Sequence, residues 1–207
     1  MTLERGATKG ASIVWNRVGS ALLLAGLLAA SGCTLPRAPA GTANVARDSL
    51  QSFSLNGRFS VRQEGKGYVG SMRWRHAGER NELVVSSPLG QAVAEIVSDA
   101  GGARLTRSDG SSQDAEKVDL LLQSLIGYPL PLDRLVDWLR GRHPDGATLT
   151  LDDRQRPLSW RHEEWRIDYA YDSDASQALP SRLFVERLGY FELRLRIDEW
   201  QTPASEE

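Results

Sequence analysis

The sequence predicts a mainly β domain with some α: an antiparallel sheet of about ten or eleven strands that curls around its apolar side, with two helices over the open side. Two observations lead to this prediction. Apolar and polar residues alternate along nearly every segment from Leu50 to Gln201, which is the period of a half-buried strand. Only the stretch from Asp114 to Arg140 has helical spacing instead. Strands with one apolar face and a two-helix insert favour a sheet that curls around that face.

The predicted strands begin with a hairpin and continue in the same pattern. Its two strands are joined by the turn Glu64–Gly67, and each has one apolar face: Phe53, Leu55, Phe59 and Val61, then Tyr68, Met72 and Trp74. Further strands are predicted at 83–86, 91–98, 103–107, 147–152, 158–162, 165–172, 182–188 and 191–200. Two of these have a clear apolar face, formed by Trp165, Ile167, Tyr169 and Tyr171, and by Phe191, Leu193, Leu195 and Ile197.

A tight turn is predicted between the strands at 83–86 and 91–98. Ser87-Pro88-Leu89-Gly90 fits a type I turn, with Ser first, Pro second and Gly fourth. Leu89 then occupies the third position, which usually carries a small polar residue. Considered alone, the turn favours a leucine that folds back onto the core. Single exposed leucines are common on protein surfaces, so a leucine in a turn does not by itself indicate a function.

Two helices are predicted in the middle of the chain. From Asp114 to Ile126 apolar residues recur at helical spacing, with Asp114 as the expected N-cap and Gly127 after the end. A second helix is expected from Leu132 to Arg140, with Trp138 on its flank and Gly141 as its stop. A tightly closed sheet would be a packed barrel, whereas a half-open sheet would keep an apolar cavity under the helices. Tryptophan residues suit both arrangements, so composition leaves the choice open.

The N-terminus predicts export and lipidation. A basic start precedes the uncharged, mostly apolar run Val18–Ala30, which is too short to span a membrane but suits a secretory signal. The following Cys33 is the only cysteine in the sequence, and Leu28–Cys33 resembles a bacterial lipobox, in which the cysteine is acylated and becomes the N-terminus. By the sorting rule for such proteins, Thr34 in place of aspartate indicates the outer membrane. We therefore expect a lipoprotein signal peptide at 1–32, an acylated end and flexible tether at 33–50, the folded domain at 51–201 and a tail at 202–207.

The sequence has no strong catalytic, metal or nucleic-acid motif. Gly-x-Ser-x-Gly, His-Glu-x-x-His and phosphate-loop patterns are missing, and we expect His76, His143 and His162 at the surface with no metal spacing. Without residues 1–32 the chain has 22 basic and 26 acidic residues, a net charge of −4, and no basic face for nucleic acid. We therefore expect a non-enzymatic monomer without cofactor or metal. A periplasmic hydrolase that uses His162 or Asp153 is the last of the function classes that we consider.

Taken together, the motifs resemble the outer-membrane lipoprotein LolB family. The opening strand Phe53-x-Leu55-x-Gly57-Arg58 and the turn Ser87-Pro88-Leu89-Gly90 come first. The central signature is Gly127-x-x-Leu130-Pro131-x-x-x-Leu135-x-x-Trp138-Leu139-x-Gly141. Then come Trp165-x-Ile167-x-Tyr169-x-Tyr171, Leu179-Pro180-x-Arg182-Leu183 and Ile197-x-x-Trp200. Each motif alone is weak, but the ordered set covers nearly all of the predicted domain.

The resemblance implies a LolA/LolB-like half-barrel: an incomplete antiparallel β-barrel with an α-helical lid over an apolar cavity. Such a protein takes the acyl chains of client lipoproteins from the periplasmic carrier LolA and releases them into outer-membrane phospholipid. It implies a projecting turn at Pro88, Leu89 and Gly90, in which Leu89 is required for delivery, and a lipid anchor at Cys33. Candidate cavity and lid residues are Trp74, Leu83, Val85, Leu121, Leu125, Leu135, Trp138, Trp165, Ile167, Tyr169 and Leu195. The alternative is a structural outer-membrane lipoprotein scaffold with a packed barrel and no cavity for acyl chains.

Overall fold

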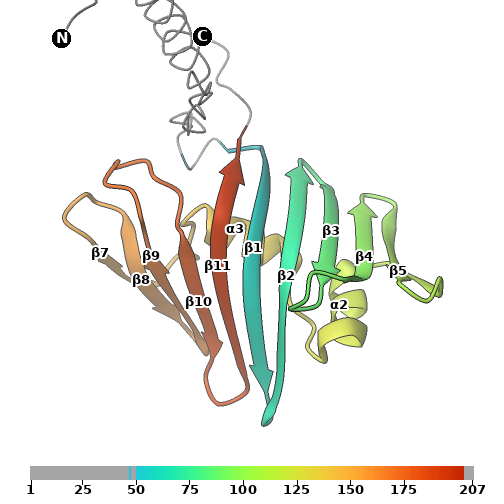
Figure 1. Ribbon diagram of the computed structural model, residues 1–207. Coiled ribbons are helices and arrows are strands. Elements are labelled where there is room, and N and C mark those ends of the chain that lie inside the picture. The colour runs from blue at the N-terminus through green and yellow to red at the C-terminus, as the bar shows by residue number, and fades with distance from the viewer. Residues whose placement is uncertain (1–46, 48–49, 203–207) are drawn as a thin grey trace, which may run out of the picture. The chain divides into compact units, whose positions relative to one another are not determined.

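A computed structural model describes residue 47 and residues 50–202, and its centre is one continuous antiparallel sheet (Figure 1). The strand order is β6-β5-β4-β3-β2-β1-β11-β10-β9-β8-β7, so the first and last strands meet in the middle. The strands are β1 Ser52–Gln63, β2 Lys66–Ala77, β3 Arg80–Ser86, β4 Ala92–Asp99, β5 Gly102–Arg107, β6 Ser112–Ala115, β7 Thr148–Leu151, β8 Pro157–His162, β9 Trp165–Ala170, β10 Arg182–Arg187 and β11 Phe191–Gln201. The eleven-stranded unclosed sheet confirms the predicted fold class. The predicted signal peptide, Cys33 and most of the tether lie outside the described residues.

The alternation in the sequence corresponds to the two faces of the sheet. In β1 the alternate residues Phe53, Leu55, Gly57, Phe59 and Val61 are buried, and the residues between them are exposed or half-buried. In β11 all four predicted inner residues, from Phe191 to Ile197, are buried. A strand exposes alternate side chains to opposite faces, so one face of the sheet becomes the apolar core.

The centre of the sheet depends on two close approaches at glycine. A Cβ atom on Gly57 would lie 2.5 Å from the carbonyl oxygen of Arg196, at the point where the pairing of β1 with β11 shifts register. A Cβ atom on Gly70 would lie 2.5 Å from the carbonyl oxygen of Ser86 and 3.2 Å from the ring of Phe59. Glycine at these positions lets neighbouring strands approach where a side chain would push them apart.

Helices α2 (Val118–Ile126) and α3 (Leu132–Leu139) lie on the apolar face of the sheet, as Figure 1 shows behind the strands. Residues 116–147, which contain both helices, join β6 to β7, the two opposite edges of the sheet. Gly127 adopts a left-handed conformation with φ 83° and ends α2 as predicted. Trp138, predicted on a flank, is instead buried.

The predicted N-cap at Asp114 is wrong. Asp114 belongs to β6, a strand that the sequence analysis did not predict, and its carboxylate accepts two hydrogen bonds from Arg104 on β5, at 2.6 and 3.0 Å. Helix α2 begins three residues later than the aspartate would require, after Lys117. A capping residue is a local signal, and here pairing with a strand ten residues upstream prevails over it.

The outer face of the sheet is charged and exposed. Asp198 on β11 accepts hydrogen bonds from Arg58 on β1, at 2.7 and 2.9 Å, and from Arg196 at 3.3 Å. These bonds, that from Arg58 first, lower the pKa of Asp198. The carboxylate thus separates two arginines that lie directly opposite each other in register. Without it, two like charges would face each other across the strands.

The turn before β8 is less solvated than its charged sequence suggests. Arg156 is buried and its guanidinium donates to Asp152 at 2.8 Å and to the backbone oxygens of Ser173 and Ala175 at 2.6 and 3.1 Å. The same group lies 4.1 Å from the centre of the Tyr171 ring. Arg156 therefore fixes the long β9–β10 connection to the β7–β8 turn.

Candidate functional site

A small apolar cavity lies between the helices and the sheet. Its volume is about 40 Å³, and every side chain that lines it is apolar. The lining consists of Phe59, Val61, Met72, Leu83, Val85, Leu122, Ile126, Leu130, Leu132, Leu135, Leu193 and Leu195. The strands β1, β2, β3 and β11 form the floor, and the two helices with their connection form the roof. Such a lining can hold hydrocarbon but offers no group for a metal or a polar ligand.

The eleven residues proposed from the sequence fall into three groups. Leu83, Val85, Leu135 and Leu195 line the cavity. Trp74, Leu121, Ile167 and Tyr169 are buried in the surrounding core, and Leu125 packs half-buried against it. Trp138 and Trp165 lie in a separate aromatic group. The sequence analysis did not propose most of the lining residues. The alternation along the strands does place Phe59, Val61, Met72 and Leu193 on the inner face, so this signal could have found them.

The aromatic group fills the space beyond the cavity. Trp138 on α3 packs against Trp160 on β8, with ring centres 6.2 Å apart, and against Trp165 on β9 at 5.0 Å. The indole Nε1 of Trp160 donates to the hydroxyl of Tyr169 at 3.0 Å, and burial raises the pKa of Tyr169. These large rings pack against one another, so they support the C-terminal half of the lid.

A polar clasp fastens the end of α3 to the sheet. The Nη2 of Arg140, which follows α3, lies 3.2 Å from Nε2 of His76 on β2, while Nδ1 of His76 lies 2.9 Å from Oδ1 of Asn81 on β3. The same Oδ1 accepts from Nε1 of Trp74 at 3.0 Å. Because Oδ1 can only accept and the guanidinium can only donate, these contacts require the neutral histidine with its proton on Nδ1.

His76 was expected at the surface, and that prediction is wrong: the side chain is only 6 % exposed. Burial, as the largest cause, lowers the pKa of His76, and the hydrogen bond to Asn81 opposes this effect. Burial also lowers the pKa of the Arg140 guanidinium, whose Nε is buried without a hydrogen-bond partner. The clasp is therefore a polar contact with incomplete hydrogen bonding inside the core.

The connection between α2 and α3 is held at the opposite end of the lid. The Tyr128 ring stacks on Phe191, the first residue of β11, with ring centres 4.0 Å apart. The Tyr128 hydroxyl lies 3.4 Å from Nη1 of Arg187. Within the lid, the backbone N–H of Leu132 donates to Asp119 at 3.2 Å, which joins the start of α3 to the first turn of α2. The lid therefore meets the sheet at two ends and covers the apolar cavity between them.

The turn at Ser87–Gly90 projects from the domain. The N–H of Gly90 donates to the backbone oxygen of Ser87 at 2.9 Å, and Gly90 has a φ of 82°, which suits glycine. The N–H of Gln91 also donates to Oγ of Ser87 at 3.3 Å. Leu89 is 88 % exposed, so the arrangement favoured by turn chemistry alone, a leucine packed on the core, is not the one observed.

The residues considered for catalysis do not converge. Asp153 lies in the turn between β7 and β8, His162 is the last residue of β8, and neither lines the cavity. Among residue 47 and residues 50–202, no three His, Cys, Asp or Glu side chains form a group that could hold a metal ion. In the same part of the chain, no helix combines the length and apolar character needed to cross a membrane.

Comparison with known proteins agrees with this geometry. Residues 51–200 match the family described as outer membrane lipoprotein LolB. The outer-membrane lipoprotein LolB of Dechloromonas aromatica (strain RCB) is 38% identical over 190 residues, covering 89% of this chain and 97% of its own length. The same-named protein of Azoarcus sp. (strain BH72) is 35% identical over 173 residues, covering 83% of this chain and 89% of its own.

Solved structures show the same fold at low sequence identity. A putative outer membrane lipoprotein-sorting protein domain from Vibrio parahaemolyticus aligns with a TM-score of 0.52 at 11% identity, covering 79% of this chain and 91% of its own. A DUF1329 family protein from Desulfovibrio piger gives 0.51 at 12% identity, covering 78% and 89%. The family match over most of the chain, together with the half-barrel and its apolar cavity, shows that this protein belongs to the outer membrane lipoprotein LolB family.

Proposed function

We propose that this protein is a lipid-anchored protein of the outer membrane that receives lipoproteins from a periplasmic carrier of the LolA type and inserts them into that membrane without catalysing a reaction. The observation that carries the proposal is the wholly apolar cavity beneath α2 and α3 in a member of the LolB family. The ligand would be the acyl chains of the client, because a lining without polar groups offers nothing to a sugar, nucleotide or peptide.

The energetics of acyl transfer need no chemical step. Each buried CH₂ group contributes about 0.8 kcal/mol, so the chains of a client lipoprotein cannot cross an aqueous space unprotected. Transfer proceeds downhill if this cavity holds the chains more tightly than the carrier does and less tightly than the bilayer. Such a protein needs no nucleotide site, nucleophile or metal.

The lid has to move before an acyl chain can enter. The cavity of about 40 Å³ is far below the roughly 300 Å³ at which ligand pockets begin. The lid is held by apolar packing and by few polar contacts with the sheet, such as the clasp from Arg140 to His76. Neither helix has a side-chain hydrogen bond at its N-cap. Lifting the helices would expose the apolar floor formed by β1, β2, β3 and β11.

Leu89 is the proposed membrane-inserting residue in the turn Pro88-Leu89-Gly90. Its side chain is 88 % exposed on a turn fixed by hydrogen bonds, so it can enter a bilayer without any refolding of the domain. We expect Leu89→Glu to accept client lipoprotein from the loaded carrier at the wild-type rate but to fail to incorporate it into vesicles. The assay follows the client through both steps using the acylated full chain.

A matched control is available in Leu158, a leucine of β8 that is 45 % exposed. Leu158→Glu adds the same charge on another surface and is expected to deliver normally. Normal delivery by Leu89→Glu would refute the role of the turn. A wild-type protein that takes no client from the carrier would refute the proposed function itself and would favour a packed scaffold.

The anchor is proposed to be Cys33, which lies outside the described residues. Replacing it by alanine removes the thiol that receives the diacylglycerol, so we expect Cys33→Ala to be recovered in the soluble fraction. Mass spectrometry of the mature N-terminus and membrane fractionation check this. A Cys33→Ala protein that fractionates with membranes as the wild type does would contradict the anchor.

A further inference from the structure

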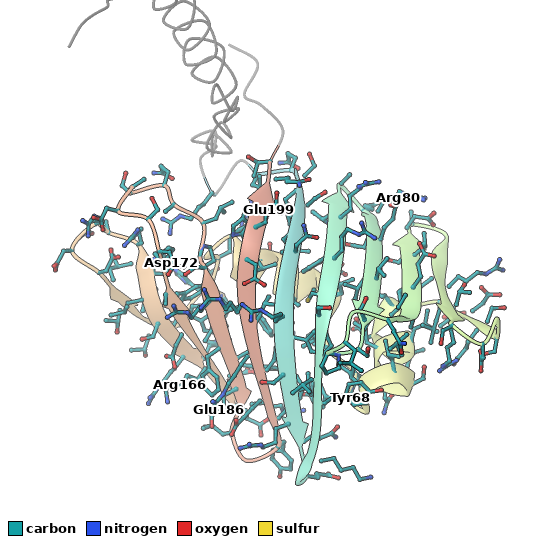
Figure 2. All side chains as sticks on the ribbon, in the orientation of Figure 1. Tyr68, Arg80, Arg166, Asp172, Glu186 and Glu199 are labelled. Carbon is teal, nitrogen blue, oxygen red and sulfur yellow. The ribbon has the colours of Figure 1, made fainter. Side chains whose placement is uncertain are left out.

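The end of the sheet that holds the β1–β2 and β10–β11 turns carries most of the exposed apolar side chains. Eight large apolar residues are exposed in the described part of the chain, and five of them lie at or toward this end: Tyr68, Val69, Leu89, Leu188 and Tyr190. Figure 1 shows the β1–β2 and β10–β11 turns side by side there, away from the start of β1. Figure 2 places Tyr68 toward this end of β2, and Arg80 and Glu199 toward the other.

Strand register makes this end continuous. Gln63 pairs with Lys66 across the β1–β2 turn and with Phe191 on β11, so the two hairpins end at the same level. Strand β3 stops pairing with β2 at Ser71, and β2 continues alone on that side from Gly70 to Lys66. Tyr68 and Val69 therefore lie between the turn that carries Leu89 and the two hairpin tips.

The side chains at the tips have the chemistry of a bilayer interface. Leu188 is 56 % and Tyr190 is 59 % exposed, on a turn closed by the N–H of Tyr190 donating to the backbone oxygen of Arg187 at 3.0 Å. Tyrosine is enriched where an apolar ring meets lipid headgroups. Charges of both signs lie at the tips: Glu64 and Lys66 in the β1–β2 hairpin, and Arg187 paired with Glu164 at 2.7 Å beside the β10–β11 turn. The contact would therefore depend on apolar burial more than on anionic lipid.

The same end lies next to the connection between the two lid helices. Tyr128, in the connection between α2 and α3, stacks on Phe191 beside the β10–β11 turn. Val61 and Leu193 line the cavity, and they pair with each other two residues away from the Gln63–Phe191 pair at the hairpin tips. An acyl chain that leaves between the helix connection and the sheet would emerge among the exposed side chains.

The tether allows this end to face the membrane. Arg47 donates to the Tyr171 hydroxyl and Leu50 is buried, so the chain is held on the domain from residue 47 onward. The thirteen residues 34–46 can span at most about 45 Å, whereas the twelve residues of β1 span about 40 Å. A protein anchored at Cys33 can therefore place the far end of β1 against the membrane that holds it.

We propose that the β1–β2 and β10–β11 hairpin tips, through Tyr68, Val69, Leu188 and Tyr190, form a second contact with the phospholipid bilayer, distinct from Leu89, at the end of the cavity from which acyl chains leave. This inference rests on the proposed function, because a protein that releases acyl chains has to bring its cavity to the bilayer.

Spin labels on the acylated full chain test the contact directly. In the anchored form the only native cysteine is modified, so Leu188→Cys, Tyr190→Cys, Leu89→Cys and the control Leu158→Cys each provide one reactive thiol. The readout is the collision rate with oxygen, which partitions into lipid, against that with a water-soluble nickel chelate. In neutral phospholipid vesicles we expect labels at 188, 190 and 89 to gain oxygen and lose nickel contact, and the label at 158 to remain in water.

Labels at 188 and 190 that stay as accessible to nickel as the label at 158 would overturn the second contact. If the label at 89 enters lipid in that experiment and the unlabelled wild type delivers its client, the proposed function stands and only this inference fails. As a functional readout, Leu188→Ser with Tyr190→Ser is expected to slow client incorporation by about tenfold or more. Leu158→Ser is expected to leave it unchanged, and equal rates for both variants would count against the contact.

Discussion

The clasp between His76 and Arg140 predicts an acid-sensitive attachment of the lid. In the folded protein His76 is neutral, because Nε2 accepts from the Arg140 guanidinium and Nδ1 donates to Asn81. A second proton would place an N–H donor and a positive charge against the guanidinium. Asp133 and Asp137 on α3 raise the pKa of His76. Burial, the largest influence, lowers it, so the pKa stays below its ordinary value.

The sign and size of the effect follow from proton linkage. The pKa of His76 in the folded protein lies below its ordinary value of 6.5, so the unfolded chain binds this proton first as the pH falls. The free energy of unfolding should be independent of this group well above pH 6.5 and should decrease below it. One histidine can contribute at most about 1.4 kcal/mol per pH unit until the folded form also protonates.

Urea unfolding of the full chain between pH 7.5 and pH 5.0 measures this slope. His76→Gln keeps an amide that can donate and accept but cannot titrate, so its slope should be smaller than that of the wild type. His143→Gln, at an exposed histidine, should retain the wild-type slope. Amide exchange in α3 should also accelerate at pH 5.5 in the wild type, since the clasp fastens that helix. Equal slopes for the wild type and His76→Gln would refute the reasoning.

Three further substitutions test the packing around the cavity. Gly70→Ala places a methyl group 2.5 Å from a carbonyl oxygen of the next strand and should cost about 1–3 kcal/mol in urea unfolding, whereas Gly67→Ala, with no neighbour nearer than 4.0 Å, should cost less than about 1 kcal/mol. Tyr169→Phe removes the acceptor of the Trp160 N–H and should cost about 1–3 kcal/mol; an unchanged unfolding midpoint would contradict the buried bond. Leu135→Ala should enlarge the cavity, lower stability by about 2–5 kcal/mol and increase binding of a small apolar dye, with unaltered dye binding as the contrary result.

The sequence predicted the sheet well because each strand obeys a short-range rule. Burial on alternate positions identified the inner faces of β1 and β11, and the turn at Ser87–Gly90 formed where Pro and Gly indicated. The errors concern residues whose partners are distant in sequence. His76 is buried because Arg140 arrives from 64 residues away, and Asp114 joins β5 instead of capping α2.

The size and lining of the cavity also depend on contacts between residues that are distant in sequence. Helical spacing indicated which lid residues face the sheet, but it could not determine how closely the lid settles on it. Of the proposed lid residues, Leu135 lines the cavity, whereas Trp138 packs against Trp160 and Trp165. That difference depends on where β8 and β9, which carry Trp160 and Trp165, lie against α3, and no local pattern in α3 encodes this. The 88 % exposure of Leu89 likewise depends on how the rest of the described chain packs and not on the sequence of the turn alone.

The connection from β6 to β7 restricts what the protein can carry. Because residues 116–147 run from one edge strand to the other, the helices and the sheet form a ring around the cavity, which is closed by hydrogen bonds where β1 pairs with β11. The ring can loosen, but the helices cannot open like a hinged cover unless an edge strand detaches or β1 separates from β11. A folded client domain is too large to pass beneath it, whereas a flexible hydrocarbon chain can slide in lengthwise. The client's polypeptide must therefore stay outside the ring throughout transfer, which makes acceptance independent of the client's fold.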